Sequence, residues 1–289
     1  MLDAASGTDL DRRGLVTTLP LWSALGVIER PDLVQAIHED NLRAGADVVT
    51  TVTFRTTGRT LAKAGMDPGL AADLDARAVR LARQARAATG RADALIAGSI
   101  APLEDCYSPW LMPEPATALA EHRAQARNLA EAGADFLMAE TMPCVAEATI
   151  ALRAAQETGL PATVGFVCLP AAGDEPPRLM SGETLDEAVA AVEPLGPAAI
   201  LVNCADPATI AAGLAALRAR TTRPVGGYAN FGEVDGERGW KVGAPQDAAA
   251  FARGAAGWLA AGAAIIGGCC GTTPAHTAAL RALLDAKPG

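Results

Sequence analysis

The chain has 289 residues, of which 50% are hydrophobic and 20% are charged, a balance typical of a folded globular protein rather than a disordered or fibrous one. Its formal net charge is -9 and it has no lysine- or arginine-rich run, which argues against nucleic acid as a partner. Residues 1–14 lack the apolar core of a signal peptide, and no stretch is long and apolar enough to span a membrane, so we expect a cytoplasmic protein without a membrane partner.

Short apolar runs alternate along the chain with longer Ala-, Leu- and Arg-rich stretches of helical spacing, as expected of βα units. Runs that are apolar on both faces favour a parallel sheet covered by helices. Since such barrels typically have about 250 residues, we predict an α/β fold, an eightfold β/α (TIM) barrel with outer helices, formed by residues 1–289 as one domain. The eight predicted strands, in chain order, cover residues 1–3, 47–54, 94–100, 135–141, 162–168, 198–204, 224–230 and 264–270.

The connections between these elements also carry signals. An Ala-Gly-Ala repeat ends a helical stretch and opens a strand at residues 44–47, 132–135 and 261–264, where the glycine suits a left-handed helix cap. Residues 170–177 are rich in Pro and Gly and predict a long loop after the fifth strand. Because the loops that follow the strands build the active sites of such barrels, we expect the chemistry at strand ends.

The strongest motif is Gly-Gly-Cys-Cys-Gly at residues 267–271, directly after an apolar run. Consecutive side chains of a strand point to opposite faces, so Cys269 and Cys270 can bind one ion only if the backbone leaves strand geometry, which the glycines permit. Cys204 ends the sixth predicted strand, which barrel topology places at the same rim. Three thiolates suit zinc, and three protein ligands with one open position are typical of a catalytic zinc site.

The remaining cysteines and the histidines have simpler interpretations. Disulfides are not expected in a chain of this length without a secretion signal, and one between neighbouring cysteines would be strained. Three isolated cysteines are interpreted as small buried hydrophobic residues: Cys106, Cys144 and Cys168. Three histidines in helical stretches are expected at the surface or behind the site rather than as ligands: His38, His122 and His276.

On these residues the chain resembles the homocysteine S-methyltransferase family, which includes S-methylmethionine- and betaine-dependent enzymes and the homocysteine domain of methionine synthase. The resemblance implies an eightfold barrel in which Cys204, Cys269 and Cys270 bind Zn²⁺ and the substrate thiolate is the fourth ligand. A thiol bound to zinc loses its proton at neutral pH and becomes nucleophilic. The segments that carry the resemblance are residues 2–3, 20–24, 44–54, 98–102, 140–141, 181–183, 203–204, 228–230 and 267–272.

The resemblance also implies substrate-binding residues. Asp3 and Glu140 match carboxylates that hold the amino end of the substrate, the alternatives being a frayed terminus and a helix N-terminal acid. Asn203 is expected either to orient the ligand shell or to shape a turn. A methylated onium donor is a cation that aromatic faces bind, whereas core packing is the alternative for the aromatic residues. Residues expected at the barrel mouth are Trp22, Phe54, Tyr228 and Asn230, with Glu233 in the following loop.

The expected activity is methyl transfer from a small onium donor of the S-methylmethionine, S-adenosylmethionine or betaine type to the zinc-bound thiolate of homocysteine, forming methionine. Many family members carry two glycines where this chain has Ala4 and Ala5, and an Asn is frequent where it has Val52, so another thiol or a selenol remains an alternative acceptor. A separate corrinoid protein remains an alternative donor.

Two other functional classes are alternatives to a methyltransferase. A non-catalytic zinc- or thiol-binding protein is one alternative. The other is a Schiff-base barrel enzyme, which needs a lysine at a strand end. None of the lysines lies at a predicted strand end: Lys63, Lys241 and Lys287.

Overall fold

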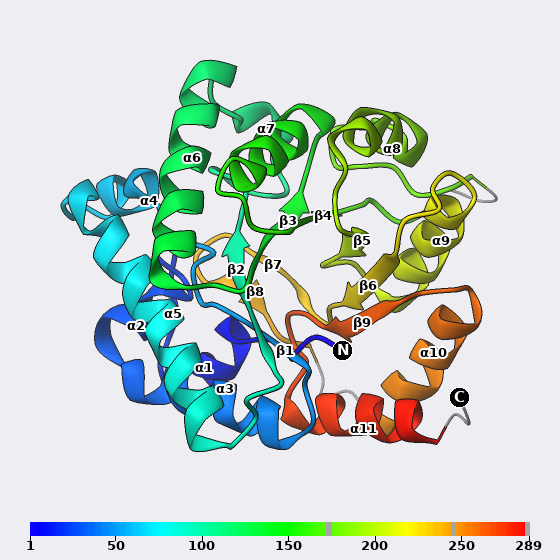
Figure 1. The fold of residues 1–289 in the computed structure, drawn as a ribbon, viewed down its shortest axis with the longest axis horizontal. Helices are drawn as coiled ribbons and strands as arrows, with labels where there is room; N and C mark the ends of the chain where they lie inside the picture. Colours follow the sequence, from blue (N-terminus) through cyan, green and yellow to red (C-terminus); the bar gives the residue numbers. More distant parts are fainter. Residues whose placement is uncertain (172–174, 244–246, 287–289) are drawn as a thin grey trace.

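The structure is a computed structural model that describes residues 1–171, 175–243 and 247–286. A parallel sheet of seven strands, in the order β1-β2-β3-β4-β5-β6-β9, curls at the centre of the molecule and is surrounded by helices (Figure 1). The predicted α/β architecture with parallel strands is therefore confirmed. The strands are β1 (Val48–Thr50), β2 (Leu95–Ile100), β3 (Phe136–Met142), β4 (Ala162–Phe166), β5 (Ile200–Asn203), β6 (Val225–Ala229) and β9 (Ile265–Gly268).

Local sequence signals set many of the helix ends. The side chain of Asp206 accepts hydrogen bonds from two backbone N–H groups of the first turn of α9, and α6 ends at Gly133, whose φ of 93° is left-handed. The helices are α1 (Gly7–Arg12), α2 (Ala24–Glu29), α3 (Pro31–Arg43), α4 (Gly58–Lys63), α5 (Ala71–Ala88), α6 (Pro115–Ala132), α7 (Val145–Gln156), α8 (Leu185–Val192), α9 (Pro207–Arg218), α10 (Ala248–Ala260) and α11 (Pro274–Asp285). Short 3₁₀ helices are η1 (Pro68–Leu70), η2 (Pro109–Leu111) and η3 (Glu193–Leu195). None of the described helices is long and apolar enough to cross a membrane.

The prediction of eight strands is confirmed only for seven. Residues 1–3 form an isolated bridge, between Leu2 and Val48, instead of a strand. The backbone N–H of Leu2 donates to the carbonyl of Ile266 in β9 (2.9 Å), and the N–H of Asp47 donates to the carbonyl of Met1 (2.9 Å). This segment thus lies between the two edge strands of the sheet, but it is too short to pair along either of them.

Alternation along the strands separates the core from the interior of the curled sheet. In β5, Ile200 and Val202 belong to the large hydrophobic cluster shared with the outer helices, whereas Leu201 belongs to a smaller cluster with Tyr228. Successive side chains of a strand point to opposite faces. The smaller cluster therefore lines the inner, concave face of the curled sheet, whereas the large cluster lies between the sheet and the helices.

Several strands end earlier than predicted. The strand predicted at 47–54 ends at Thr50, because the hydroxyls of Thr51 and Thr53 bond to each other and Thr53 then bonds to the carbonyl of Ser99. The strand predicted at 162–168 ends at Phe166, and residues 172–174 of the predicted loop lie outside the described residues.

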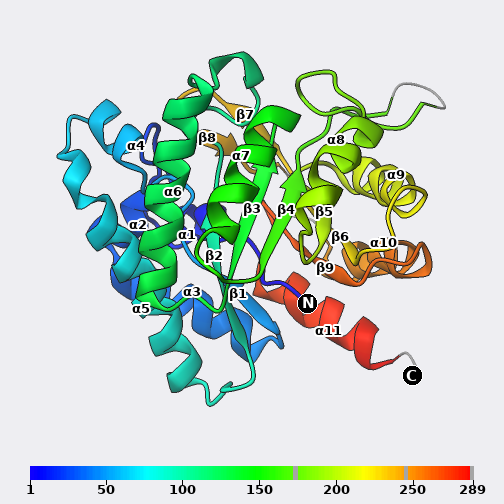
Figure 2. The same ribbon diagram turned by 45° about the horizontal axis from the view of Figure 1, so that its top comes forward.

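An antiparallel hairpin that was not predicted follows β6. It consists of β7 (Glu233–Asp235) and β8 (Gly239–Lys241). Figure 2 shows it near the carboxyl ends of the central strands. The hairpin therefore covers the end of the sheet where the active site was expected.

Candidate metal centre and active-site cavity

A cavity of about 490 Å³ opens at the carboxyl ends of the strands. Its walls come from the N-terminal segment, from the end of β3, from the loops that follow β1, β2, β5 and β9, and from the hairpin. Side chains far apart in the sequence thus meet in one place, as predicted. The predicted site residues that line it are Asp3, Trp22, Phe54, Glu140, Cys204, Tyr228, Cys269 and Cys270.

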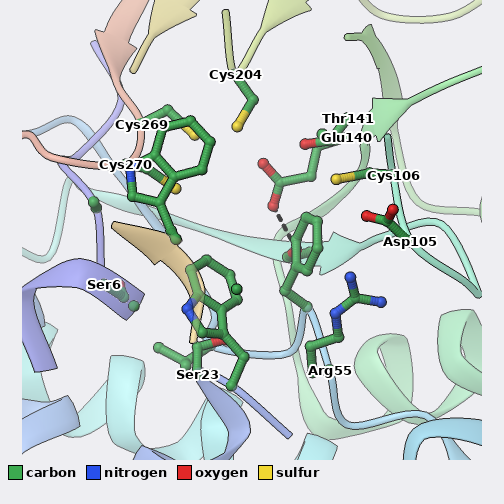
Figure 3. Close-up of a pocket in the computed structure, with 18 of the residues that line it drawn as sticks. Ser6, Ser23, Arg55, Asp105, Cys106, Glu140, Thr141, Cys204, Cys269 and Cys270 are labelled. Atoms are coloured by element: carbon green, nitrogen blue, oxygen red, sulfur yellow. Dashed lines mark hydrogen bonds between the residues drawn. The ribbon is translucent and has the colours of Figure 1, made fainter. Parts of the chain in front are cut away.

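The sulfur atoms of Cys204, Cys269 and Cys270 lie within 4.8 Å of one another. Figure 3 shows the three side chains gathered at one end of the cavity. A tetrahedral zinc ion with Zn–S bonds of about 2.3 Å requires sulfurs about 3.8 Å apart, so the cluster fits such an ion with small adjustments. The residues present therefore suit a soft metal with one coordination position left toward the cavity.

The backbone leaves strand geometry at both places that supply the cysteines. Cys204 follows β5 with a left-handed φ of 54°. After β9 ends at Gly268, the N–H of Cys269 donates to the carbonyl of Ala229 (2.7 Å). A Cβ at Gly268 would lie 2.3 Å from the hydroxyl oxygen of Thr272, so only glycine fits this turn. The turn brings both neighbouring sulfurs to the same cluster.

Polar groups surround the sulfur of Cys204. The hydroxyl of Tyr107 lies 3.4 Å from it and the side-chain amide of Asn230 donates to it at 3.5 Å. Hydrogen bonds from the thiols of Cys269 and Cys270 lower the pKa of Cys204 well below its ordinary value. Negative charge on this sulfur is therefore stabilised by four neighbouring groups.

Two buried carboxyl groups face the same cavity. Asp3 accepts hydrogen bonds from the backbone N–H (2.9 Å) and the hydroxyl (3.0 Å) of Thr50. Glu140 accepts from the hydroxyls of Ser99 and Tyr228, the latter at 2.9 Å. Burial raises the pKa of each carboxyl to about 7, and the nearby Glu140 charge adds to the increase at Asp3. Neither forms an ion pair with a described residue, which suits the pair to a cationic group of a ligand.

These positions exclude the simpler interpretations of the two carboxylates. Asp3 is 4% exposed, so it does not belong to a frayed terminus. Glu140 lies within β3 and not at the start of a helix. The next residue, Thr141, has a left-handed φ of 60°, and its backbone N–H donates to the side-chain oxygen of Asn203 (3.0 Å). Asn203 therefore holds an irregularity near the end of β3 and does not line the cavity.

Two aromatic pairs form walls of the cavity. Trp22 and Phe54 meet edge to face with centroids 5.8 Å apart, and Tyr107 stacks on Trp240 at 6.3 Å. Sequence reasoning missed Tyr107 and Trp240, which lie in the loop after β2 and in the hairpin. Tyr228, by contrast, donates its hydroxyl hydrogen bond to Glu140, and its ring packs in the inner hydrophobic cluster.

Other predicted residues lie elsewhere or need correction. Glu233 is exposed and 3.6 Å from Lys241, away from the cavity wall. Cys144 and Cys168 are buried as expected, and Cys106 is buried but also lines the cavity. The surface alternative is wrong for the histidines, which are buried in helices α3, α6 and α11: His38, His122 and His276.

The lysines give no support to a Schiff-base site. Lys63 ends α4 and is ion-paired with Glu104, and Lys241 is exposed in β8. Lys287 lies outside the described residues.

Comparisons with known proteins agree with this arrangement. The family model for homocysteine S-methyltransferase matches residues 1–284. A homocysteine S-methyltransferase of Escherichia coli is 32% identical, over 98% of this chain and 94% of its own length. Homocysteine S-methyltransferase YbgG of Bacillus subtilis is 30% identical, over 95% of this chain and 90% of its own length. The metallated form of the E. coli homocysteine methyltransferase MmuM matches with a TM-score of 0.81 and 31% identity, over 97% of this chain and 94% of that one. The chain belongs to the homocysteine S-methyltransferase family.

Proposed function

We propose that this protein is a zinc-dependent homocysteine S-methyltransferase that moves a methyl group from a small onium donor to the thiolate of homocysteine, forming methionine. The observation that carries the proposal is the cluster of Cys204, Cys269 and Cys270, with sulfurs within 4.8 Å, in a cavity that also holds two buried carboxyl groups. Family membership and the metallated form of the E. coli relative support a metal at this cluster.

Zinc bound to the three cysteines would lower the pKa of the acceptor thiol, so that the acceptor sulfur is ionised and nucleophilic at neutral pH. The protein's own groups orient the cluster: the Asn230 amide donates to the Cys204 sulfur, and the Tyr107 hydroxyl lies 3.4 Å from it. Hydrogen bonds of this kind fix the position and basicity of a ligand atom.

Asp3 and Glu140 would hold the ammonium group of the acceptor. Both carboxyl groups have pKa values raised to about 7 by burial, so an arriving ammonium favours their ionised form and gains two charge-assisted hydrogen bonds. Ala4 and Ala5 line the same part of the cavity, and their backbone N–H groups are already bonded to Asn41 and Thr272. Their methyl groups narrow the acceptor end of the cavity. A comparison of homocysteine with another thiol and with a selenol as acceptors tests which of them this end binds.

The two aromatic pairs would bind the positive methyl donor, since ring faces attract sulfonium and quaternary ammonium groups. We further infer that residues 1–3 complete an eightfold β/α barrel and that residues 1–289 form one domain. The bridge of Leu2 to Val48 of β1 and its hydrogen bond to the carbonyl of Ile266 in β9 support the closure.

The test measures zinc content, proton release and methyl transfer under reducing conditions. We expect a single zinc per wild-type chain, lost in Cys204→Ser and in Cys269→Ser. The control Cys144→Ser should keep zinc, because this sulfur lies near Met112 and not in the cluster. Adding homocysteine should release a proton, and a panel of S-methylmethionine, S-adenosylmethionine and betaine should identify the donor. Zinc-free wild type, or zinc-loaded protein without methyl transfer from any donor, would refute the proposal.

A further inference from the structure

Two cationic side chains, Arg55 and Lys63, are among the described residues that line the cavity. Lys63 is ion-paired with Glu104. Arg55 has no carboxylate partner among the described residues: one terminal nitrogen donates to the backbone carbonyl of Glu104 (2.9 Å), and its Nε is buried without a hydrogen-bond partner. A guanidinium with unused donors facing a cavity is matched by a planar anion.

The Arg55 side chain is held in place before any ligand arrives. Its guanidinium carbon lies 5.2 Å from the ring centroid of Phe54. Asp105, which also lines the cavity and is labelled in Figure 3, already accepts hydrogen bonds from the N–H of Tyr107 (3.2 Å) and the hydroxyl of Ser108 (2.7 Å). Preorganised donors lose little conformational entropy when they bind an anion.

Figure 3 shows Arg55 reaching into the cavity from the side opposite the cysteine cluster. The cysteines and the carboxyl pair of Asp3 and Glu140 would take the thiol and ammonium ends of the acceptor. On the Arg55 side lies the aromatic pair of Trp22 and Phe54, with Phe54 directly beneath the guanidinium. The pair of Tyr107 and Trp240 lies beside the cysteine cluster instead. A molecule whose onium group contacts the aromatic rings and whose carboxylate lies a few bonds away would reach both features at once.

We propose that Arg55 binds the carboxylate of the methyl donor and thereby selects onium compounds that carry a carboxylate. The proposal rests on the proposed function, because it assigns the donor end of the same site. A bidentate guanidinium–carboxylate contact supplies two charge-assisted hydrogen bonds. Its removal should weaken donor binding about 10- to 100-fold, as expected for hydrogen bonds between charged groups.

The experiment compares wild type with Arg55→Gln, Arg55→Lys and the control Lys63→Gln, which removes a positive charge from the same cavity mouth. Initial rates are measured with S-methylmethionine and with S-methylmethioninol, whose hydroxymethyl group replaces the carboxylate. We expect Arg55→Gln to raise KM for S-methylmethionine about 10- to 100-fold, with KM for S-methylmethioninol and for homocysteine changed less than about twofold. Arg55→Lys should recover part of the loss and Lys63→Gln should match wild type.

A second measurement needs no turnover. Quenching of tryptophan fluorescence, from Trp22 and Trp240 in the cavity wall, reports donor binding without homocysteine. The dissociation constant of S-methylmethionine should rise in Arg55→Gln by the same factor as KM.

Three results would overturn the inference: an equal loss for both donors, an equal loss in Lys63→Gln, or a rise in KM for homocysteine instead of the donor. The first result would mean that Arg55 only maintains the shape of the cavity wall. The second would mean that any positive charge near the cavity has the same effect, and the third that Arg55 binds the acceptor. Failure of the proposed function looks different, since wild type would then transfer no methyl group from any donor. The fluorescence titration still decides the role of Arg55 in that case.

Discussion

Among the residues that the structure describes, three other than glycine have left-handed backbone conformations, and all three line the cavity: Trp22 (φ 43°), Thr141 (φ 60°) and Cys204 (φ 54°). Each costs about 1 to 3 kcal/mol and persists only where surrounding contacts enforce it. For Thr141 the enforcing contact is Asn203, from a different strand. The sequence predicts the cysteines through their residue type and spacing, but it cannot predict this irregularity in β3, because the irregularity depends on a contact between distant segments.

The buried Glu140 carboxyl makes the stability of the metal-free protein depend on pH. Its pKa is about 7 in the folded protein and 4.5 in its ordinary state, so the folded protein keeps the proton longer than the unfolded chain does. The stabilisation is fully present below about pH 4.5 and is lost as pH rises through about 7. The loss amounts to at most about 3 kcal/mol. Glu140→Gln removes the titrating group and keeps one oxygen acceptor for Ser99 or Tyr228, while its NH2 group can donate to the other hydroxyl.

We therefore expect urea denaturation of the metal-free, reduced proteins to show similar stability for wild type and Glu140→Gln at pH 5, and a more stable variant at pH 8. Exposed Glu131→Gln is the control and should track wild type at both pH values. A variant that is less stable than wild type at pH 8 would mean that the ionised carboxylate stabilises the fold.

At the scale of elements, the periodicity of apolar residues predicts which segments become strands but not where they stop. β1 stops at Thr50 because threonine hydroxyls replace the strand ladder by local bonds. The hairpin of β7 and β8 was missed although Asp235-Gly236 is a hairpin dipeptide. Each flanking strand has three residues and a single apolar one, Val234 or Trp240, which is too few to mark an alternation. That omission also hid Trp240, which the hairpin carries into the cavity.

The turn after β9 depends on Gly268. A Cβ there would lie 2.3 Å from the hydroxyl oxygen of Thr272, which donates to the carbonyl of Cys269 (2.7 Å). We expect Gly268→Ala to displace this turn, to destabilise the protein by about 1 to 3 kcal/mol as overpacked sites do, and to weaken zinc binding in competition with a chromophoric chelator.

Gly254→Ala in α10 is the matched control, because no atom would lie within 4 Å of its new Cβ. It should leave zinc affinity unchanged and be neutral or stabilising by up to about 1 kcal/mol, since alanine favours helices over glycine. Equal zinc affinity in the two variants would show that the cysteine turn tolerates a side chain at residue 268.

At the scale of the whole molecule, the curled sheet brings the ends of β5 and β9 close enough to form one cysteine cluster, with residues 1–3 between its two edge strands (Figure 1). Leu2 bridges to Val48 on one side and donates to Ile266 on the other. The carbonyl of Asp3 accepts from the N–H of Gly268 (3.2 Å), directly before the cysteine pair. The position of the cysteine pair and the contacts between the two edges of the sheet thus depend on the same short segment.

Two leucines that flank Val48 test this closure. Leu2 is 4% exposed, whereas Leu95, its counterpart on the other side of β1, is 47% exposed. We expect Leu2→Ala to lower the free energy of unfolding in urea by about 2 to 4 kcal/mol, as buried leucines do. Leu95→Ala should lower it by less than about 1 kcal/mol. If the two losses are equal, residues 1–3 contribute no more than an exposed strand end, and the edges of the sheet are held together by the outer helices instead.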